Sequence, residues 1–178
     1  MKKRDLFQLF IDELEDMYSA EIQITEALPK LIKQASLPEL KEALTSHLKE
    51  TEEQVSRIEE IFSILEMTSK AKTCEGMKGI LKEGDEMVKN KAKSPVLDAA
   101  IISAAQKVEH YEIASYGTLR SFAKHLDLGR DVTELLQATL NEEGSADKKL
   151  TKIAEGSFFS EGVNEDAVKV GASHSSKK

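Results

Sequence analysis

The chain contains few of the residues that interrupt helices or build covalent and thiolate sites. Its 178 residues include one cysteine, three prolines and nine glycines. The single cysteine, Cys74, excludes an internal disulfide and a thiolate cluster, so oxygen and nitrogen ligands must hold any metal bound here. This favours iron or manganese over structural zinc. The scarcity of proline and glycine is typical of long helices and argues against strands.

Long apolar runs and basic stripes are also missing. The sequence has no run of 18 or more apolar residues, and its basic start leads into an amphipathic stretch rather than the apolar region of a signal peptide. With 25 basic and 32 acidic residues the formal charge is -7, and no basic stripe is interleaved with aromatics. We therefore expect a cytosolic protein without a nucleic-acid or membrane partner. Its length predicts one domain.

Apolar periodicity predicts four long helices and one short helix. The long segments are 5–35, 36–65, 94–126 and 131–153, and the short one, 74–88, lies in a lysine-rich connection between residues 67 and 93. Ser36 with Glu39 has the spacing of a capping box, and Ser94 before Pro95 is typical of an N-cap. Short turns within each pair of long helices predict two antiparallel hairpins.

The long connection indicates how the two hairpins are joined. It is long enough to run the length of a bundle, which predicts an all-α, ferritin-like four-helix bundle over residues 1–160. After Gly156 the apolar period fades and the last residues are small or charged. We expect a loose C-terminal tail over residues 161–178.

Carboxylates interrupt the apolar stripe of every long segment. Residues seven apart on a helix differ by only about 20° in direction, so the stripe can be followed through its polar positions. Glu21 lies seven residues from both Leu14 and Leu28, and Glu143 lies seven from both Leu136 and Leu150. These two glutamates are predicted to face the core.

The second and third segments leave alternatives open. In 36–65, His47, Glu50 and Gln54 share one narrow sector of the helix; in 94–126, both Glu109 and Glu112 could point inward. Asp147 follows Glu143 by one turn. An unpaired buried carboxylate is costly, so one per helix requires a common partner, and two metal ions are the natural candidate.

The two hairpins repeat the same spacing. Glu21 to Glu50 spans 29 positions and Glu112 to Glu143 spans 31. This predicts a pseudo-twofold site for two iron ions, with manganese as the alternative, in which Glu50 and Glu143 bridge and Glu21 with Glu112 or Glu109 are terminal ligands. The usual Glu-x-x-His pairs are absent. His47 could therefore be a ligand, a donor to a ligand, or neither.

Several short sequences resemble the ferritin-like stress-response proteins of the YciE/YciF family. They are Tyr18–Glu21, His47–Thr51, Val108–Glu112, Leu140–Glu143, Asp147–Leu150 and the crossover segment Cys74–Met77. The likeness covers roughly residues 3–160. It implies a ferritin-like bundle related to rubrerythrins and other di-iron proteins, and a homodimer.

Two functions are consistent with these residues. One is a di-metal centre that acts on dioxygen or peroxide or oxidises iron, and nothing in the sequence chooses among these reactions. The chain has no rubredoxin-type cysteine pair to deliver electrons, which argues against a complete rubrerythrin. The other is a non-catalytic stress-response dimer that uses the scaffold to bind partners and keeps a vestigial or structural site. Storage in a hollow shell is a third option that no residue pattern supports.

Overall fold

A computed structural model describes residues 3–157 and 160–175, which are almost entirely helical. Its helices are α1 (Lys3–Gln34), α2 (Pro38–Ile64), α3 (Glu75–Val88), α4 (Pro95–His125), α5 (Arg130–Glu155) and α6 (Val163–Ser175). Two short strands, β1 (Gly156–Ser157) and β2 (Ser160–Glu161), pair antiparallel. The all-α class is confirmed. The four long helices end within about two residues of the bounds predicted from periodicity.

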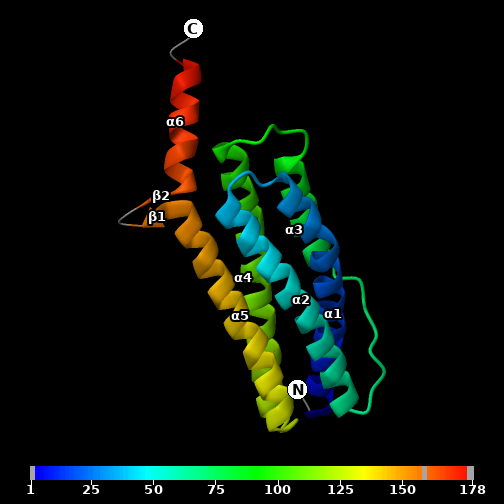
Figure 1. Cartoon of the computed structure of the whole chain (residues 1–178). Coiled ribbons are helices and arrows are strands. Elements are labelled where there is room, and N and C mark those ends of the chain that lie inside the picture. Colours follow the sequence, from blue (N-terminus) through cyan, green and yellow to red (C-terminus); the bar gives the residue numbers. More distant parts are fainter. Residues whose placement is uncertain (1–2, 158–159, 176–178) are drawn as a thin grey trace.

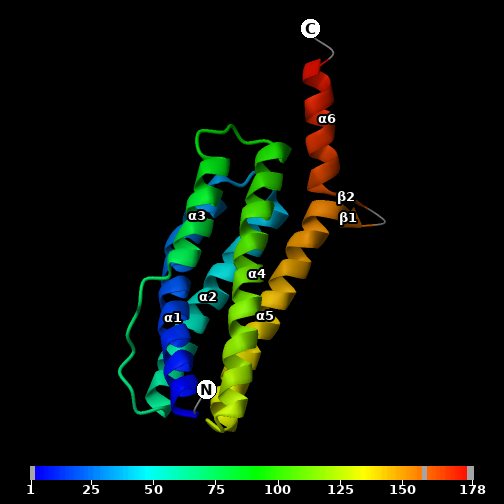
Figure 2. The ribbon, with the colours of Figure 1, turned by 180° about the vertical axis from the view of Figure 1, so that it is seen from behind.

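The four long helices form a bundle in which α1 and α5 run in one direction and α2 and α4 in the other (Figure 1). The connection between α2 and α4 returns along the whole bundle, so these two helices are parallel. It carries α3, which packs against α1 and α4 (Figure 2). This is the ferritin-like arrangement, and it places one face of every long helix toward a common axis.

The core is apolar toward both ends of the bundle and polar in the middle. The end where α1 begins contains Phe10, Phe62, Leu119 and Leu136, all completely buried. The opposite end contains Leu28, Leu40, Ile101 and Ile153, which are at most 4% exposed. Burying such side chains supplies most of the stability of a bundle. The polar layer between these ends is held in place by this packing.

The start of α2 differs from the predicted capping box. Leu37 occupies the N-cap position and its side chain makes no capping bond. The cap comes instead from buried Asp98 on α4, which accepts hydrogen bonds from the backbone N–H of Ser36 at 2.7 Å and of Leu37 at 3.1 Å. A carboxylate can satisfy several helix-terminal donors at once. At the start of α4 the prediction is confirmed: Ser94 Oγ accepts from Leu97 N at 3.2 Å.

Helix α6 occupies most of the segment for which the sequence predicts a loose tail. It follows the β1–β2 pair and lies beside α4 and the end of α5 (Figures 1 and 2). Two acidic residues in its first turn, Glu165 and Asp166, favour a helix start through the helix dipole. Residues 176–178 lie outside the described part of the chain. Within the described ranges, no helix is long and apolar enough to cross a membrane.

Candidate metal centre

Every long helix contributes a buried ionisable side chain to the middle of the bundle. Glu21 comes from α1, His47 from α2, Glu109 and Glu112 from α4, and Glu143 from α5. None of these side chains is more than 5% exposed. Both alternatives on α4 are thus buried, because residues three apart on a helix share a face.

The five side chains form one cluster. Ligand atoms of His47, Glu109, Glu112 and Glu143 all lie within 4.8 Å of one another. His47 Nε2 lies 3.2 Å from Glu109 Oε1. Glu21, on α1 of the same hairpin as His47, adjoins the group, and its charge acts on both Glu109 and Glu112. The structure therefore brings together five of the seven residues that the sequence singled out.

The cluster leaves an unusual number of polar atoms without partners. Within the described part of the chain, all but one of the buried side-chain nitrogen and oxygen atoms that lack a hydrogen bond belong to the cluster or to the adjoining Gln54. They include both nitrogens of His47, both oxygens of Glu112, and one oxygen each of Glu21, Glu109 and Glu143. Buried polar atoms are normally satisfied, since leaving one unpaired costs about 1–3 kcal/mol. A concentration of them at one point indicates a ligand-binding site.

The environment makes ionisation of the glutamates unfavourable. Burial, and then the negative charge of Glu143, raise the pKa of Glu21 to about 8, although a hydrogen bond from Tyr116 opposes this. Burial likewise raises the pKa of Glu109 and of Glu112 well above the ordinary glutamate value, and neighbouring carboxylates add to the effect. A multivalent cation would reverse this situation by stabilising the ionised forms.

His47 experiences opposing influences. Burial lowers the pKa of its imidazole, but contact with Glu50 and the charges of Glu143 and Glu21 outweigh burial, so the pKa is raised. Its Nδ1 lies 3.8 Å from Glu50 Oε2, and neither ring nitrogen makes a hydrogen bond. Neutral imidazole is a good ligand for iron and manganese. In the neutral form one of the two nitrogens is therefore available to a cation.

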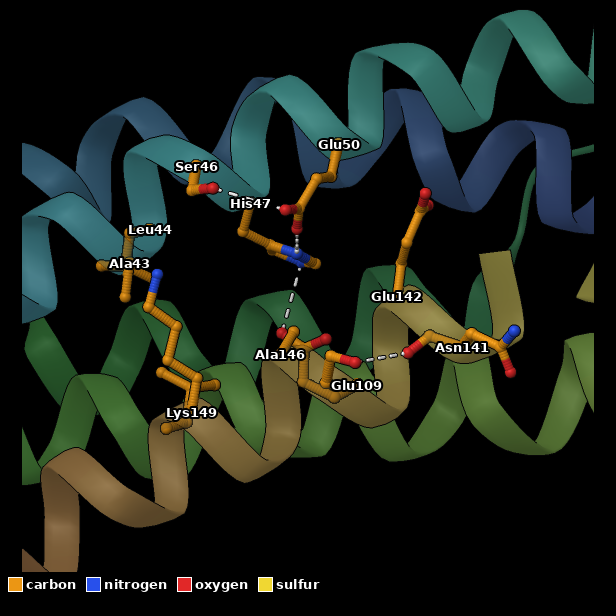
Figure 3. A pocket seen from close by; sticks show the side chains of 12 residues that line it. Ala43, Leu44, Ser46, His47, Glu50, Glu109, Asn141, Glu142, Ala146 and Lys149 are labelled. Atoms are coloured by element: carbon orange, nitrogen blue, oxygen red, sulfur yellow. Dashed lines mark hydrogen bonds and ion pairs between the residues drawn. The ribbon is translucent and has the colours of Figure 1, made fainter. Parts of the chain in front are cut away.

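Glu50 lies at the edge of the site rather than within it. Its side chain is 41% exposed and accepts a hydrogen bond from Ser46 Oγ at 3.3 Å. It lines a pocket of about 350 Å³ between α2 and α5, with His47 and Glu109 on its inner wall and Lys149 on the other side (Figure 3). This pocket gives the cluster polar access to solvent. The assignment of Glu50 as a bridging ligand stays a prediction.

Asp147 also lies outside the cluster. Its carboxylate accepts a hydrogen bond from Gln106 Nε2 at 3.0 Å and lies 3.3 Å from His110 Nε2. Both contacts lie on the α4–α5 side of the bundle and engage Asp147 Oδ1. Its assignment as a ligand likewise stays a prediction.

Three neighbours of the cluster carry contacts that the sequence did not indicate. Tyr116 donates its hydroxyl hydrogen to Glu21. Gln54 donates to Glu143 and also to Glu142 at 3.0 Å, and Arg57 pairs with Glu142 through both of its terminal nitrogens. Tyr116 and Gln54 orient site carboxylates. A tyrosine or glutamine in line with the glutamates on its helix is the only sequence signal for such a role.

Comparison with known proteins agrees with this architecture. A family model described as a domain of unknown function, DUF892, matches residues 5–167. The chain belongs to the DUF892 family. Protein YciF of Escherichia coli (strain K12) is 44% identical over 155 residues, which is 86% of this chain and 93% of YciF. The resemblance to the YciE/YciF stress-response proteins is therefore confirmed.

Solved structures of similar proteins share the fold. YcfI of Rhodopseudomonas palustris, provisionally described as a structural protein, superposes with a TM-score of 0.81 at 44% identity, covering 84% of this chain and 94% of YcfI. The E. coli stress protein YciF gives 0.79 at 44% identity, covering 83% and 92%. A protein of Xanthomonas campestris pv. campestris gives 0.64 at 19% identity over 83% and 89%, which shows the fold alone.

Proposed function

We propose that this protein is a di-metal carboxylate protein whose buried cluster binds two iron ions, or two manganese ions, and acts on dioxygen or peroxide. The observation that carries the proposal is the group of unpartnered buried atoms on Glu21, His47, Glu109, Glu112 and Glu143. Four carboxylates and one imidazole, without a thiolate, suit hard or borderline divalent cations. Four ionised glutamates also balance the charge of two such ions.

The roles of the residues follow from their contacts. Glu112, which has both oxygens free of partners, would hold the ions together with Glu109 and His47, which also line the α2–α5 pocket. Tyr116 and Gln54 hold Glu21 and Glu143 in place by donating hydrogen bonds to one oxygen of each. Bound iron would supply redox chemistry that no side chain provides.

Anaerobic reconstitution with Fe²⁺ or Mn²⁺, followed by metal analysis, tests this proposal. About two equivalents are expected for the native protein, as in other dinuclear bundles. Glu143→Gln should lose at least one equivalent, whereas Glu53→Gln, which changes a 72% exposed carboxylate on α2, should retain both. Native protein that binds no metal would contradict the proposal. Glu50→Gln decides separately whether the residue at the pocket edge is a ligand.

A second candidate is a non-catalytic stress-response dimer in which the metal site is structural. The position of Glu50 outside the cluster favours this structural role. Without Glu50, the α1–α2 hairpin has no carboxylate in the cluster that corresponds to Glu143 of the other hairpin. Consumption of dioxygen or peroxide by the metal-loaded protein separates the two candidates. A loaded protein that consumes neither would support the structural role, and sedimentation analysis would test the dimer.

A further inference from the structure

A second cavity adjoins the cluster, and its lining differs chemically from that of the α2–α5 pocket. A small cavity of about 20 Å³ lies between α1, α3 and α4 and reaches His47 and Glu109. Its remaining lining is apolar and includes Ile24, Leu28, Leu81 and Ala105. Polar side chains therefore occur only at its inner end.

A groove lies directly outside this cavity. The groove, of about 410 Å³, lies along α3 and shares four lining residues with the cavity: Ala27, Leu31, Leu81 and Val108. Lys30 on α1 forms an ion pair with Asp85 on α3 beside the groove. Only these shared side chains lie between the groove and the cavity that reaches the imidazole of His47.

Helix α3 forms the outer wall of the groove and is fixed closely to the bundle. At Gly84 an added Cβ would lie 3.1 Å from Ala104 Cβ, so glycine allows α3 to approach α4. At its N-terminus, Cys74 Sγ lies 3.0 Å from Tyr111 Oη, and Tyr111 donates a hydrogen bond to Asp16 at 3.1 Å. The crossover helix thereby keeps an apolar cover over this side of the cluster.

The size and lining of the cavity select its occupant. A volume of about 20 Å³ holds roughly one water-sized molecule. A buried water requires two to four polar partners, and only His47 and Glu109 at the inner end offer any, so the apolar remainder of the cavity suits an uncharged gas such as xenon. Peroxide and metal cations carry polar or charged surfaces, and the α2–α5 pocket, with Glu50 and Lys149, suits them better.

We infer that the cavity between α1, α3 and α4 is a binding site for a small uncharged gas molecule, and that dioxygen reaches the cluster along it. Metal ions and polar molecules use the α2–α5 pocket instead. The inference of a gas-binding site depends only on the size and lining of the cavity. The use of this site by dioxygen in a reaction rests on the proposed function. The two parts of the inference can therefore be tested separately.

Xenon binding to the metal-free full-length protein tests the gas site. Methyl resonances of Ile24, Leu28 and Leu81 should shift as xenon pressure rises, and dissolved dioxygen should broaden the same signals through its paramagnetism. Ala27→Leu places a larger side chain at the junction of groove and cavity and should reduce these shifts several-fold. Ala146→Leu is the matched control, because it makes the same change at a half-buried helical alanine in the α2–α5 pocket.

The outcomes separate the gas site from the proposed function. Three results would overturn the inference. The native protein could show no shifts, the shifts could persist in Ala27→Leu, or they could be confined to Leu44 and Leu150 of the α2–α5 pocket. If Ala27→Leu does not fold, Leu81→Ala replaces it and should increase xenon affinity; unchanged affinity would count against the site. Xenon binding combined with failure to bind metal would leave the cavity standing and reject the proposed function.

Discussion

Helix α4 carries buried carboxylates in two regions, and they differ in how their oxygens are used. Asp98, near the start of the helix, is 3% exposed and satisfies the first backbone donors of the α1–α2 turn. Glu112, about four turns further on, is completely buried and has no hydrogen-bond partner on either oxygen. The first arrangement stabilises the fold at once. The second carries a cost that protonation or a bound cation must offset.

Removing Asp98 should have the largest effect on stability among these substitutions. Asp98→Ala leaves the N–H groups of Ser36 and Leu37 and the hydroxyl of Ser36 without their buried acceptor. We expect the free energy of unfolding to fall by about 3 kcal/mol, measured by urea denaturation. Asp98→Asn keeps one acceptor oxygen and should lose less. If the Asp98→Ala variant proves as stable as the native protein, the cap is unimportant.

The metal-free protein should become less stable as pH rises from 5 to 8. The pKa of Glu21 is raised from 4.5 to about 8 in the folded state, so the folded protein retains a proton that the unfolded chain releases in this range. The loss should be on the order of 3–4 kcal/mol, at about 1.4 kcal/mol per pH unit, and thermal denaturation across this pH range measures it. Glu21→Gln should flatten the dependence. Stability that increases with pH would contradict the assigned environment of Glu21.

Glu112→Gln should change the stability of the metal-free protein in the opposite direction to Asp98→Ala. The amide has nearly the shape of the carboxyl group but cannot ionise, so the variant avoids the cost of holding a proton or a buried charge beside Glu21, Glu109 and Glu143. We expect the metal-free variant to be more stable by about 1 kcal/mol at pH 8, and added Mn²⁺ to stabilise it far less than the native protein. If the substitution destabilises the metal-free protein as Asp98→Ala does, the distinction between the two carboxylates fails.

Tyr116→Phe should have the smallest effect of these changes, a small shift in the pH dependence of metal binding. Loss of the hydroxyl removes the hydrogen bond that lowers the pKa of Glu21, so that carboxyl should deprotonate at higher pH. The pH at which Mn²⁺ begins to stabilise the protein should rise, by under about one unit. Tyr18→Phe is the matched control, because it removes a hydroxyl bonded to Glu59 outside the cluster. It should leave the pH at which Mn²⁺ begins to stabilise the protein unchanged.

Helix positions were predictable from the sequence because they depend on local periodicity. The apolar residues that recur along each segment place the helices, and seven-residue spacing correctly predicted that Glu21 and Glu143 face the core. The cap of α2 was not predictable, since its acceptor Asp98 lies 62 residues from Ser36. Helix α6 was missed because its apolar period is weak and its neighbours lie on distant parts of the chain.

The cluster itself was predictable only in part. On α2, His47 and Glu50 are three residues apart, and a small rotation of the helix decides which of them is buried. Packing against the other helices sets that rotation; it buries His47 and leaves Glu50 at the pocket edge. Asp147 similarly lies one turn from Glu143, but contacts with Gln106 and His110 draw it away from the cluster.

Crystals of the protein grown or soaked with Mn²⁺, with data collected near the manganese absorption edge, test the central claim most directly. We expect two anomalous peaks within coordination distance of the side chains of Glu21, His47, Glu109, Glu112 and Glu143. Peaks found only at surface carboxylates, with these five side chains still unpartnered, would contradict it.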